Sequence, residues 1–221
     1  LQNTLAHRAR RNTLTGSRRN IEAHYELGND LYRLFLDDTM TYSSAVFESP
    51  DQSLADAQRA KYRAIAERAG LQGGEHVLEI GSGWGGFALY AAGELGCRVT
   101  TLTISPAQHA LATERVAGAG LADRVSVELR DYRQIEGTYD AIVSIEMLEA
   151  VGAEYFATFF EACDRALVAG SGPAVEARRP LLRAGETSPR AAVLPEMLLG
   201  TGGQREPGRA RDGDRPPVAL V

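Results

Sequence analysis

The sequence predicts an α/β fold in which helices cover both faces of a doubly wound parallel sheet, with a helical cap in front of it. From residue 71 onward, short β-rich runs alternate with helical patterns. Such alternation is typical of βαβ units, which place parallel strands in one sheet. Between residues 20 and 69, apolar residues recur at helical spacing only.

The cap is expected to contain three helices. Asn20 can cap the first, Gly28 ends it, and Asp30 starts the second. A longer helix begins near Ser53 and carries its apolar residues on one face. Residues 1–70 are therefore predicted to form a basic leader and a helical cap.

The sheet is expected to begin with four strands, at residues 76–80, 99–104, 124–129 and 139–145. Helices follow the first, second and fourth strands, the last of them at residues 153–168. Ser105 and Pro106 are residue types typical of a helix N-cap and of the first helical position. Residues 71–170 are therefore predicted to form one Rossmann-like domain.

The composition changes abruptly at Ser171. Residues 171–221 hold seven of the nine prolines and eight arginines, with no Phe, Tyr, Trp, Ile, Asn or Lys. A sheet of this class needs further strands here, and the pattern predicts none. The segment is either a disordered Arg/Pro/Gly-rich tail or the product of out-of-frame translation, and we favour the second. The predicted fold is thus incomplete at its C-terminus.

Composition and charge narrow the class of protein. The net charge of −5 argues against a nucleic-acid binder. No apolar run is long enough for a membrane helix, and the polar N-terminus is unlike a signal peptide, so we expect a cytoplasmic protein. Residues 1–20 carry five arginines and no acid, which suits either contact with anionic lipid head groups or a solvated leader.

The cysteines and histidines give no sign of a metal. Cys97 and Cys163 are the only cysteines, and each lies in an apolar pattern, so we expect buried free thiols rather than a disulfide or a metal pair. The four histidines have no metal-ligand spacing. We expect no structural metal.

The strongest local signal is the turn after the first predicted strand, which reads Glu79-Ile80-Gly81-Ser82-Gly83-Trp84-Gly85. Its glycines allow a tight turn and a close approach of the backbone to a ligand. Gly86 also completes the dinucleotide pattern G-x-G-x-x-G. This motif alone therefore leaves both S-adenosylmethionine and NAD open.

The strands beyond the turn favour S-adenosylmethionine. A nicotinamide enzyme usually has an acid at the end of the second strand, where this chain has Thr100, Thr101 and Thr103. Asp131 follows the third strand, where methyltransferases of this fold commonly place a group near the adenine. A plain turn-forming aspartate explains Asp131 equally well.

Six stretches occur in order over about residues 18–170: HYELGND at 24–30, TYSS at 41–44, VLEIGSGWG at 77–85, LTISPAQ at 102–108, DYR at 131–133 and SIEMLEAVG at 144–152. Together they resemble the cyclopropane-fatty-acyl-phospholipid synthase family, which includes the mycolic acid cyclopropane synthases. The resemblance implies a class I S-adenosylmethionine-dependent methyltransferase. Its substrate would be the double bond of unsaturated fatty-acyl chains of phospholipids, and its product a cyclopropane fatty acid.

The resemblance also implies roles for the matching positions. Tyr42 and Ser43 would close over the cofactor from the cap. Thr103 and Gln108 would line its ribose and methionine side, and Tyr132 would lie against the adenine. Without the resemblance, each has an ordinary structural explanation, such as a core aromatic for Tyr42 or an exposed helix residue for Gln108.

The turn itself would hold the amino-acid end of the cofactor. The cofactor-binding residues expected there and after the third strand are Glu79, Gly81, Ser82, Gly83, Gly85 and Asp131. Glu149 matches the family's active-site glutamate, which helps to hold a bicarbonate ion. Ser44 stands where some members have a cysteine beside that ion, so a backbone or hydroxyl contact would serve. Glu149 and Ser44 are the expected catalytic residues.

The resemblance names the partners and also a departure. It implies contact with phospholipid acyl chains at the inner membrane face and is compatible with a homodimer. The family draws a further histidine and tyrosine from the part of the chain after residue 170, and this sequence has neither residue type after Tyr155. Two alternatives therefore stay open: a small-molecule methyltransferase of related fold, and an inactive cofactor-binding fragment.

Overall fold

The computed structural model describes residues 29–168, 173–176, 192–193 and 219–220. Its main sheet has six strands in the order β4-β3-β2-β5-β6-β7, and neighbouring strands are parallel throughout. The strands are β2 (His76–Ile80), β3 (Arg98–Thr103), β4 (Val125–Leu129), β5 (Ala141–Ile145), β6 (Pro173–Glu176) and β7 (Ala192–Val193). Because the chain moves outward from β2 to β4 and then restarts at β5 on the other side of β2, the sheet is doubly wound.

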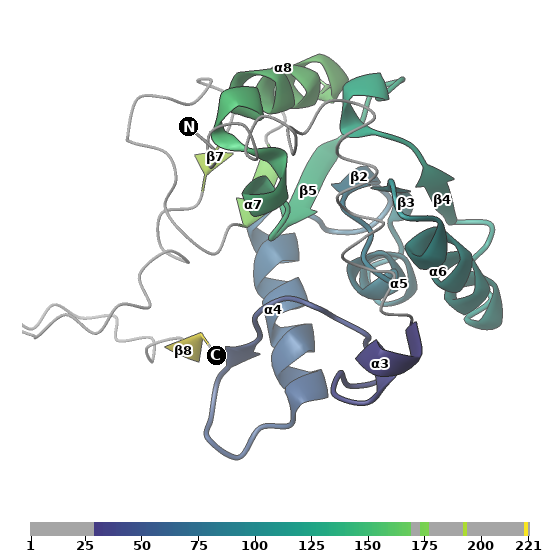
Figure 1. The fold of residues 1–221 in the computed structure, drawn as a ribbon, viewed down its shortest axis with the longest axis vertical. Coiled ribbons are helices and arrows are strands. Elements are labelled where there is room, and N and C mark those ends of the chain that lie inside the picture. Colours follow the sequence, from purple (N-terminus) through teal and green to yellow (C-terminus); the bar gives the residue numbers. More distant parts are fainter. Residues whose placement is uncertain (1–28, 169–172, 177–191, 194–218, 221) are drawn as a thin grey trace, which may run out of the picture.

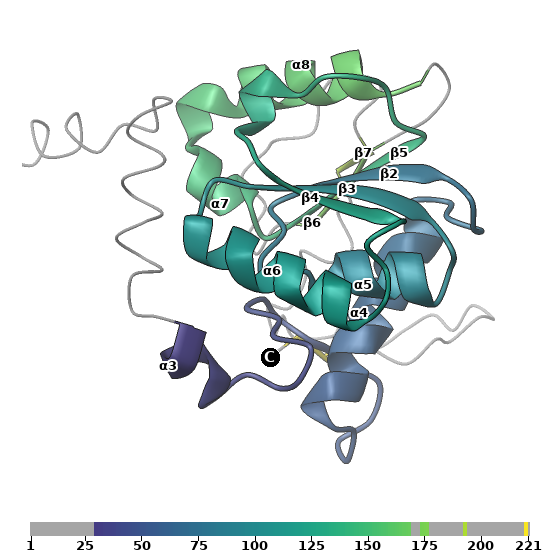
Figure 2. The same ribbon diagram turned by 90° about the vertical axis from the view of Figure 1, so that its right-hand side faces the viewer.

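Side chains alternate between the two faces of the sheet, so each face has its own core. Val77 packs into one core, while Leu78 and Ile80 pack into the other. The first core contains side chains of α4 (Leu54–Arg68), α5 (Gly86–Gly93) and α6 (Pro106–Gly118). The second contains side chains of α7 (Leu148–Val151) and α8 (Phe156–Ala166). Figure 2 shows the sheet between these two layers.

Local chemistry explains where the main helices begin. Ser53 accepts a hydrogen bond from the Asp56 amide at the start of α4, and Ser105 accepts one from the Gln108 amide at the start of α6. Both are helix N-caps, and Pro106 follows Ser105 at the first position of α6. The α6 cap matters for function because it fixes the helix directly after the end of β3.

The cap lies beside the first helix layer (Figure 1). It contains α3 (Asn29–Arg33) and β1 (Val46–Phe47), which pairs antiparallel with β8 (Ala219–Leu220). A small apolar cluster joins the cap to the α/β domain, and its buried members are Tyr32, Met40, Trp84 and Leu111. The cap is therefore packed onto the glycine turn rather than tethered loosely to it.

The four strands and the helices predicted for residues 53–168 are confirmed, with shifts of a few residues at their ends. In that region the sequence did not predict the short α7 or two 3₁₀ turns, Tyr132–Gln134 and Ala153–Tyr155. The helix predicted from Asn20 to Gly28 lies outside the described residues. Cys97 and Cys163 are buried free thiols, as expected.

The expectation of no strand after residue 171 was wrong. β6 pairs with β5 over four residues, and β7 pairs with β6. β6 lies along the otherwise open edge of β5, and this pairing accounts for the strand. The rest of this segment lies outside the described residues, so its assignment as a disordered or out-of-frame tail stays a prediction. The division of the chain at residues 70 and 170 also stays a prediction.

Candidate cofactor and active site

A cleft opens at the carboxyl ends of β2, β3, β4 and β5. The cap loop, residues 40–44, lies across it. Ten of the thirteen predicted site residues line it: Tyr42, Ser43, Glu79, Gly81, Ser82, Gly83, Thr103, Gln108, Asp131 and Tyr132. Gly85 and Ser44 are not among the lining residues, and the Glu149 side chain lies outside what the structure describes. In a doubly wound sheet, ligands bind at this edge, next to the point where the strand order reverses.

The glycine turn follows β2, and its backbone is held by hydrogen bonds and close contacts. The amides of Gly81 and Ser82 both donate to the Leu102 carbonyl oxygen, at 3.0 and 2.8 Å, which ties the turn to β3. Gly81 has φ +97°, and a Cβ added there would lie 3.1 Å from the Cγ of Met147. Gly85 lies behind the turn as the N-cap of α5, with φ +85°. Its position shapes the turn without lining the cleft.

Glu79 lies at the floor of the cleft and is almost completely buried. Its Oε2 accepts a hydrogen bond from the Thr101 hydroxyl at 2.5 Å. Burial raises the pKa of the Glu79 carboxyl to about 8, against the lowering effect of that hydrogen bond. Glu79 therefore holds its proton at neutral pH and brings no full charge to the floor of the cleft.

The end of β3 presents a fixed pair of polar side chains. The Thr103 hydroxyl donates to the Gln108 Oε1 at 2.8 Å and accepts from the Ser105 amide at 3.1 Å. Thr103 and Gln108 are both buried. Gln108 is therefore an oriented wall residue of the cleft, not the exposed helix residue that its sequence position alone allowed.

The end of β4 carries an aspartate–arginine pair. The Asp131 carboxylate accepts from the Arg133 amide at 2.9 Å and from the Arg133 guanidinium through Nε and a terminal nitrogen, both at 2.7 Å. The hydrogen bond to Asp131 raises the pKa of Arg133. Asp131 thus has its turn-forming contact and also lines the cleft. Sequence analysis assigned no role to Arg133, which lies two residues after Asp131.

Aromatic rings lie next to the aspartate–arginine pair in the wall of the cleft. The Arg133 guanidinium lies over the rings of Tyr132 and Tyr155, 5.3 and 5.9 Å from their centroids. Tyr132 also meets Phe159 of α8 edge-on at 5.2 Å. These contacts hold the Tyr132 ring in one orientation at the cleft wall.

The cap covers the cleft with a second aromatic group. Tyr42 is half exposed, and its ring lies 5.2 Å from Tyr32 and 6.2 Å from Phe35. Trp84, the only tryptophan, packs at a tilt against Tyr32, with ring centroids 4.6 Å apart, and donates its indole N–H to the Asn29 side chain at 2.8 Å. Trp84 itself lines the cleft, so the cap and the glycine turn meet at one buried indole.

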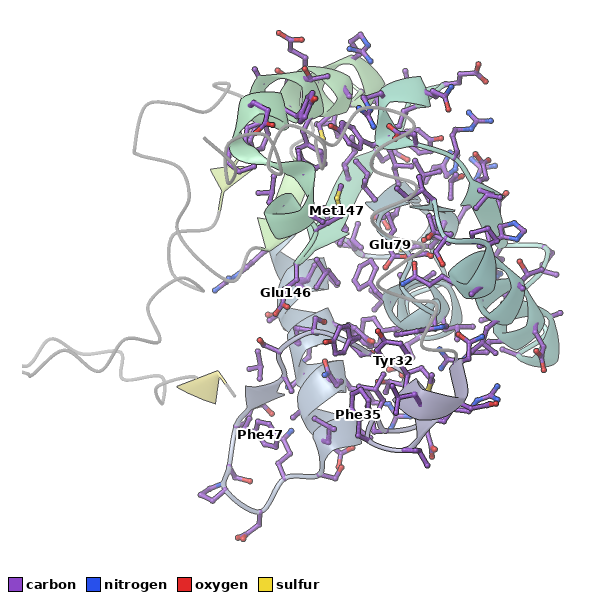
Figure 3. The ribbon with its side chains drawn as sticks, viewed as in Figure 1. Tyr32, Phe35, Phe47, Glu79, Glu146 and Met147 are labelled. Carbon is purple, nitrogen blue, oxygen red and sulfur yellow. The ribbon has the colours of Figure 1, made fainter. Side chains whose placement is uncertain are left out.

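The two predicted catalytic residues lie beside the cleft. Ser44 follows the lining residue Ser43, and its amide donates to the Glu146 Oε1 at 2.8 Å. Glu149 belongs to α7, of which Ala150 and Val151 line the cleft; the Glu149 side chain lies outside what the structure describes. Glu146 and Met147 also line the cleft, although sequence analysis assigned them no role (Figure 3).

Two classes of site are not found in the described part of the chain. No group of three His, Cys, Asp or Glu side chains there could hold a metal ion. None of the described helices combines the length and apolarity required to cross a membrane.

The glycine turn and the cleft at the switch point of a doubly wound sheet define a nucleotide-cofactor-binding α/β protein. The more particular assignment comes from comparison: the mycolic acid cyclopropane synthetase family profile matches residues 12–176. The chain therefore belongs to this family of S-adenosylmethionine-dependent enzymes, and its fold is that of a class I methyltransferase.

Individual relatives agree with the family. The chain is 45% identical to the tuberculostearic acid methyltransferase UfaA1 of Mycobacterium tuberculosis over 73% of this chain and 39% of that protein. It is 42% identical to the cyclopropane-fatty-acyl-phospholipid synthase of Escherichia coli over 65% of this chain and 36% of that protein.

A solved structure of a cyclopropane synthase is also similar to this chain. The mycolic acid cyclopropane synthase CmaA1, complexed with SAH and CTAB, superposes with a TM-score of 0.66 at 38% identity, over 69% of this chain and 53% of that one. The chain thus spans about half of this solved structure and under two fifths of the two curated relatives.

Proposed function

We propose that this chain is the cofactor-binding part of an S-adenosylmethionine-dependent methyltransferase that acts on the double bond of unsaturated fatty-acyl chains of phospholipids and forms cyclopropane fatty acids. The observation that carries the proposal is the gathering of ten predicted residues, from the cap and three strand ends, in one cleft. The identity to a cyclopropane-fatty-acyl-phospholipid synthase supports the acyl-chain substrate.

The side chains in the cleft fit the proposed cofactor. The backbone at Gly81 and Gly83 lines the cleft and allows close approach of a polar amino-acid group, because neither residue has a side chain of its own. Tyr132 offers an aromatic face to a base, and Asp131 offers carboxylate oxygens beside it. Thr103 and Gln108 would bind the ribose and methionine side. When bound, S-adenosylmethionine supplies an electrophilic methyl group.

The chain's own groups would exclude water and orient the reactants. An alkene is a poor nucleophile, so the acyl chain must be held in line with the methyl group in a dry site. The cap loop with Tyr42 closes one side of the cleft, and the neutral Glu79 adds no competing charge to its floor. Aromatic rings stabilise a cation on the acyl chain through cation–π attraction, worth ~1–2 kcal/mol when desolvated.

Ring closure requires a base that removes a proton from the newly attached methyl group. We assign to Glu149 the binding of a bicarbonate ion that supplies this base, with Ser44 beside it. Family resemblance carries this assignment. The Ser44 amide donates to Glu146 and its carbonyl accepts from Lys61, so the Ser44 hydroxyl is the group we assign to the ion.

The location of the substrate follows from its chemistry. Phospholipid acyl chains lie in the bilayer, so a protein that modifies them must work at a membrane surface. We therefore propose a cytoplasmic protein that binds peripherally to the inner face of the membrane, with a homodimer as a further element of the proposal. The leader with five arginines in residues 1–20 supports attraction to anionic head groups.

A second candidate product is a methyl branch, which the identity to a tuberculostearic acid methyltransferase favours. A saturated methyl branch adds CH₂ and two further hydrogens to the acyl chain, so it needs a reductant. A cyclopropane adds CH₂ alone. Mass therefore separates the two products.

Lipid mass spectrometry tests the proposal. The full chain and its Glu149→Gln variant would be expressed in a bacterial host that lacks cyclopropane lipids. We expect unsaturated acyl chains to gain CH₂ with the wild-type chain and not with the variant, while both bind S-adenosylhomocysteine equally. Equal lipid products from both chains would exclude the Glu149 assignment. Cofactor binding without any lipid product would support the inactive cofactor-binding fragment.

A further inference from the structure

The only lysine in the chain lies under the loop that covers the cleft. The other 23 basic residues are arginines, and most of the described ones lie at the surface. Lys61, in contrast, is fully buried in α4. Its ammonium donates to the Ser43 hydroxyl at 2.5 Å and to the Ser44 carbonyl oxygen at 2.8 Å. A compact ammonium can make these bonds in a confined space, whereas a guanidinium brings five N–H donors that would all need partners.

A second residue of α4 supports the same loop. Gln58 lies one helical turn before Lys61 and is also buried. Its side-chain amide donates to the Ser43 carbonyl oxygen at 2.8 Å. Residues three apart lie on the same face of a helix, so α4 presents two donors to successive peptide groups of the loop.

An acid reaches the same dipeptide from the sheet. Glu146 is the first residue after β5, and its Oε1 accepts the Ser44 amide hydrogen at 2.8 Å. Its backbone has φ +46°, in the left-handed region that a residue with a side chain rarely adopts. Such backbone strain persists where the surrounding structure requires it, often at functional sites. Figure 3 shows Glu146 between the sheet and the cap.

We propose that Lys61 and Glu146 form a two-sided clamp on Ser43–Ser44 and are positioning residues for the cofactor cleft. The positive ammonium meets the carbonyl oxygen of Ser44, and the negative carboxylate meets its N–H. Each peptide group therefore faces the charge that its own dipole favours, and hydrogen bonds to charged groups are stronger than neutral ones. The clamp fixes Tyr42 and Ser43 at the cleft wall; its effect on cofactor binding rests on the proposed function.

Hydrogen–deuterium exchange of the backbone amides tests the clamp without any ligand. The full chain would be compared with Lys61→Met, Glu146→Ala and the double variant. Arg59→Met, an exposed basic residue on the same helix, and Glu161→Ala, an exposed acid on α8, serve as matched controls. We expect exchange in residues 42–47 to rise at least about tenfold in both single variants, since a hydrogen bond to a charged group is worth that factor or more. The controls should leave it unchanged.

The double variant separates positioning from general stability. Two groups that hold one dipeptide give non-additive effects, so the double variant should exchange little faster at residues 42–47 than the more affected single variant. Additive effects there would overturn the clamp. Unchanged exchange in either single variant would also overturn it. The same holds if exchange in Lys61→Met rises as much across α4 as in the loop.

Cofactor affinity gives the second measurement. Trp84 lines the cleft and is the only tryptophan, so its fluorescence reports binding of S-adenosylhomocysteine. We expect both single variants to bind at least about tenfold more weakly than wild type and both controls to bind equally well. If the wild-type chain does not bind S-adenosylhomocysteine, the proposed function fails, while the exchange experiment still decides the clamp. Unweakened binding in both single variants would overturn their role as positioning residues for the cleft.

Discussion

At the scale of single residues, Glu79 is the clearest case of burial overriding a side chain's usual chemistry. Its carboxyl is almost fully enclosed, and desolvation raises its pKa to about 8. Between its ordinary pKa of 4.5 and the folded value, the folded chain keeps a proton that the unfolded chain releases. The contribution of Glu79 to the free energy of unfolding is therefore highest below pH 4.5 and falls as the pH rises to about 8.

Glu79→Gln should remove that pH dependence, because a glutamine amide has no proton to lose. We expect the free energy of unfolding of the variant, relative to wild type, to rise between pH 5 and pH 8, by at most roughly 1.4 kcal/mol per pH unit. Urea denaturation of both chains at several pH values measures the difference. Glu94→Gln, an exposed acid after α5, is the control. A parallel pH profile for Glu79→Gln and wild type would show that Glu79 is ionised in the folded chain.

At the scale of elements, the N-terminus of α5 lies against α4 and the cap loop with no room for a side chain. A Cβ added at Gly86 would collide with the Tyr62 hydroxyl and would lie 2.8 Å from the Thr41 hydroxyl oxygen. Tyr62 and Thr41 are themselves joined by a hydrogen bond between their hydroxyls. Three elements therefore meet at Gly86, and glycine is required by this close approach.

Gly86→Ala should push the cap loop away from the glycine turn. Overpacking of this kind costs ~1–3 kcal/mol of stability, and the displaced loop should also weaken S-adenosylhomocysteine binding. Gly118→Ala, at the end of α6, is the matched control because its Cβ would meet nothing within 4 Å. There we expect no loss, since alanine is the better helix former. Thermal unfolding measures the stability of both variants. Equal melting temperatures for Gly86→Ala and Gly118→Ala would contradict the packing argument.

At the scale of the whole molecule, the strand order places the cleft at the centre of the sheet. β2 lies between β3 and β5, and chain segments on either side of it supply the walls. The glycine turn continues from β2 itself, the Thr103–Gln108 pair follows β3 on one side, and Glu146 and Met147 follow β5 on the other. Neither half of the sheet alone contains the complete cleft, so site and fold form together.

A chain shortened to end at Val168 should test how far the outer strands support this arrangement. It loses β6, which pairs with all but the first residue of β5. We expect a lower urea midpoint and concentration-dependent association, because an uncovered parallel strand presents unpaired backbone groups. A chain shortened only by residues 219–221 loses β8 and its two residue pairs with β1, so it should differ little from wild type. An unchanged midpoint in the first variant would show that β6 contributes nothing to stability.

Patterns local in sequence predicted much of the fold and the site. Strand β2 and the capped start of α6 follow from β-rich runs and from the Ser105–Pro106 pair, and the family resemblance named ten of the residues that line the cleft. The Lys61 and Glu146 contacts were missed because they join residues 17 and 102 positions from Ser44. No periodicity encodes such distant pairs. β6 was missed because its strand partner, rather than its own short sequence, determines it.

The central position of β2 also has a consequence for folding during synthesis. The His76 amide donates to Asp140, 64 residues later, so one edge of β2 has no partner until β5 has been made. At typical rates of synthesis that interval lasts about 3–13 s. Contacts this distant in sequence also slow folding of the complete chain. We expect the nascent chain to depend on chaperones during this interval, while β2, β3 and β4 can already pair.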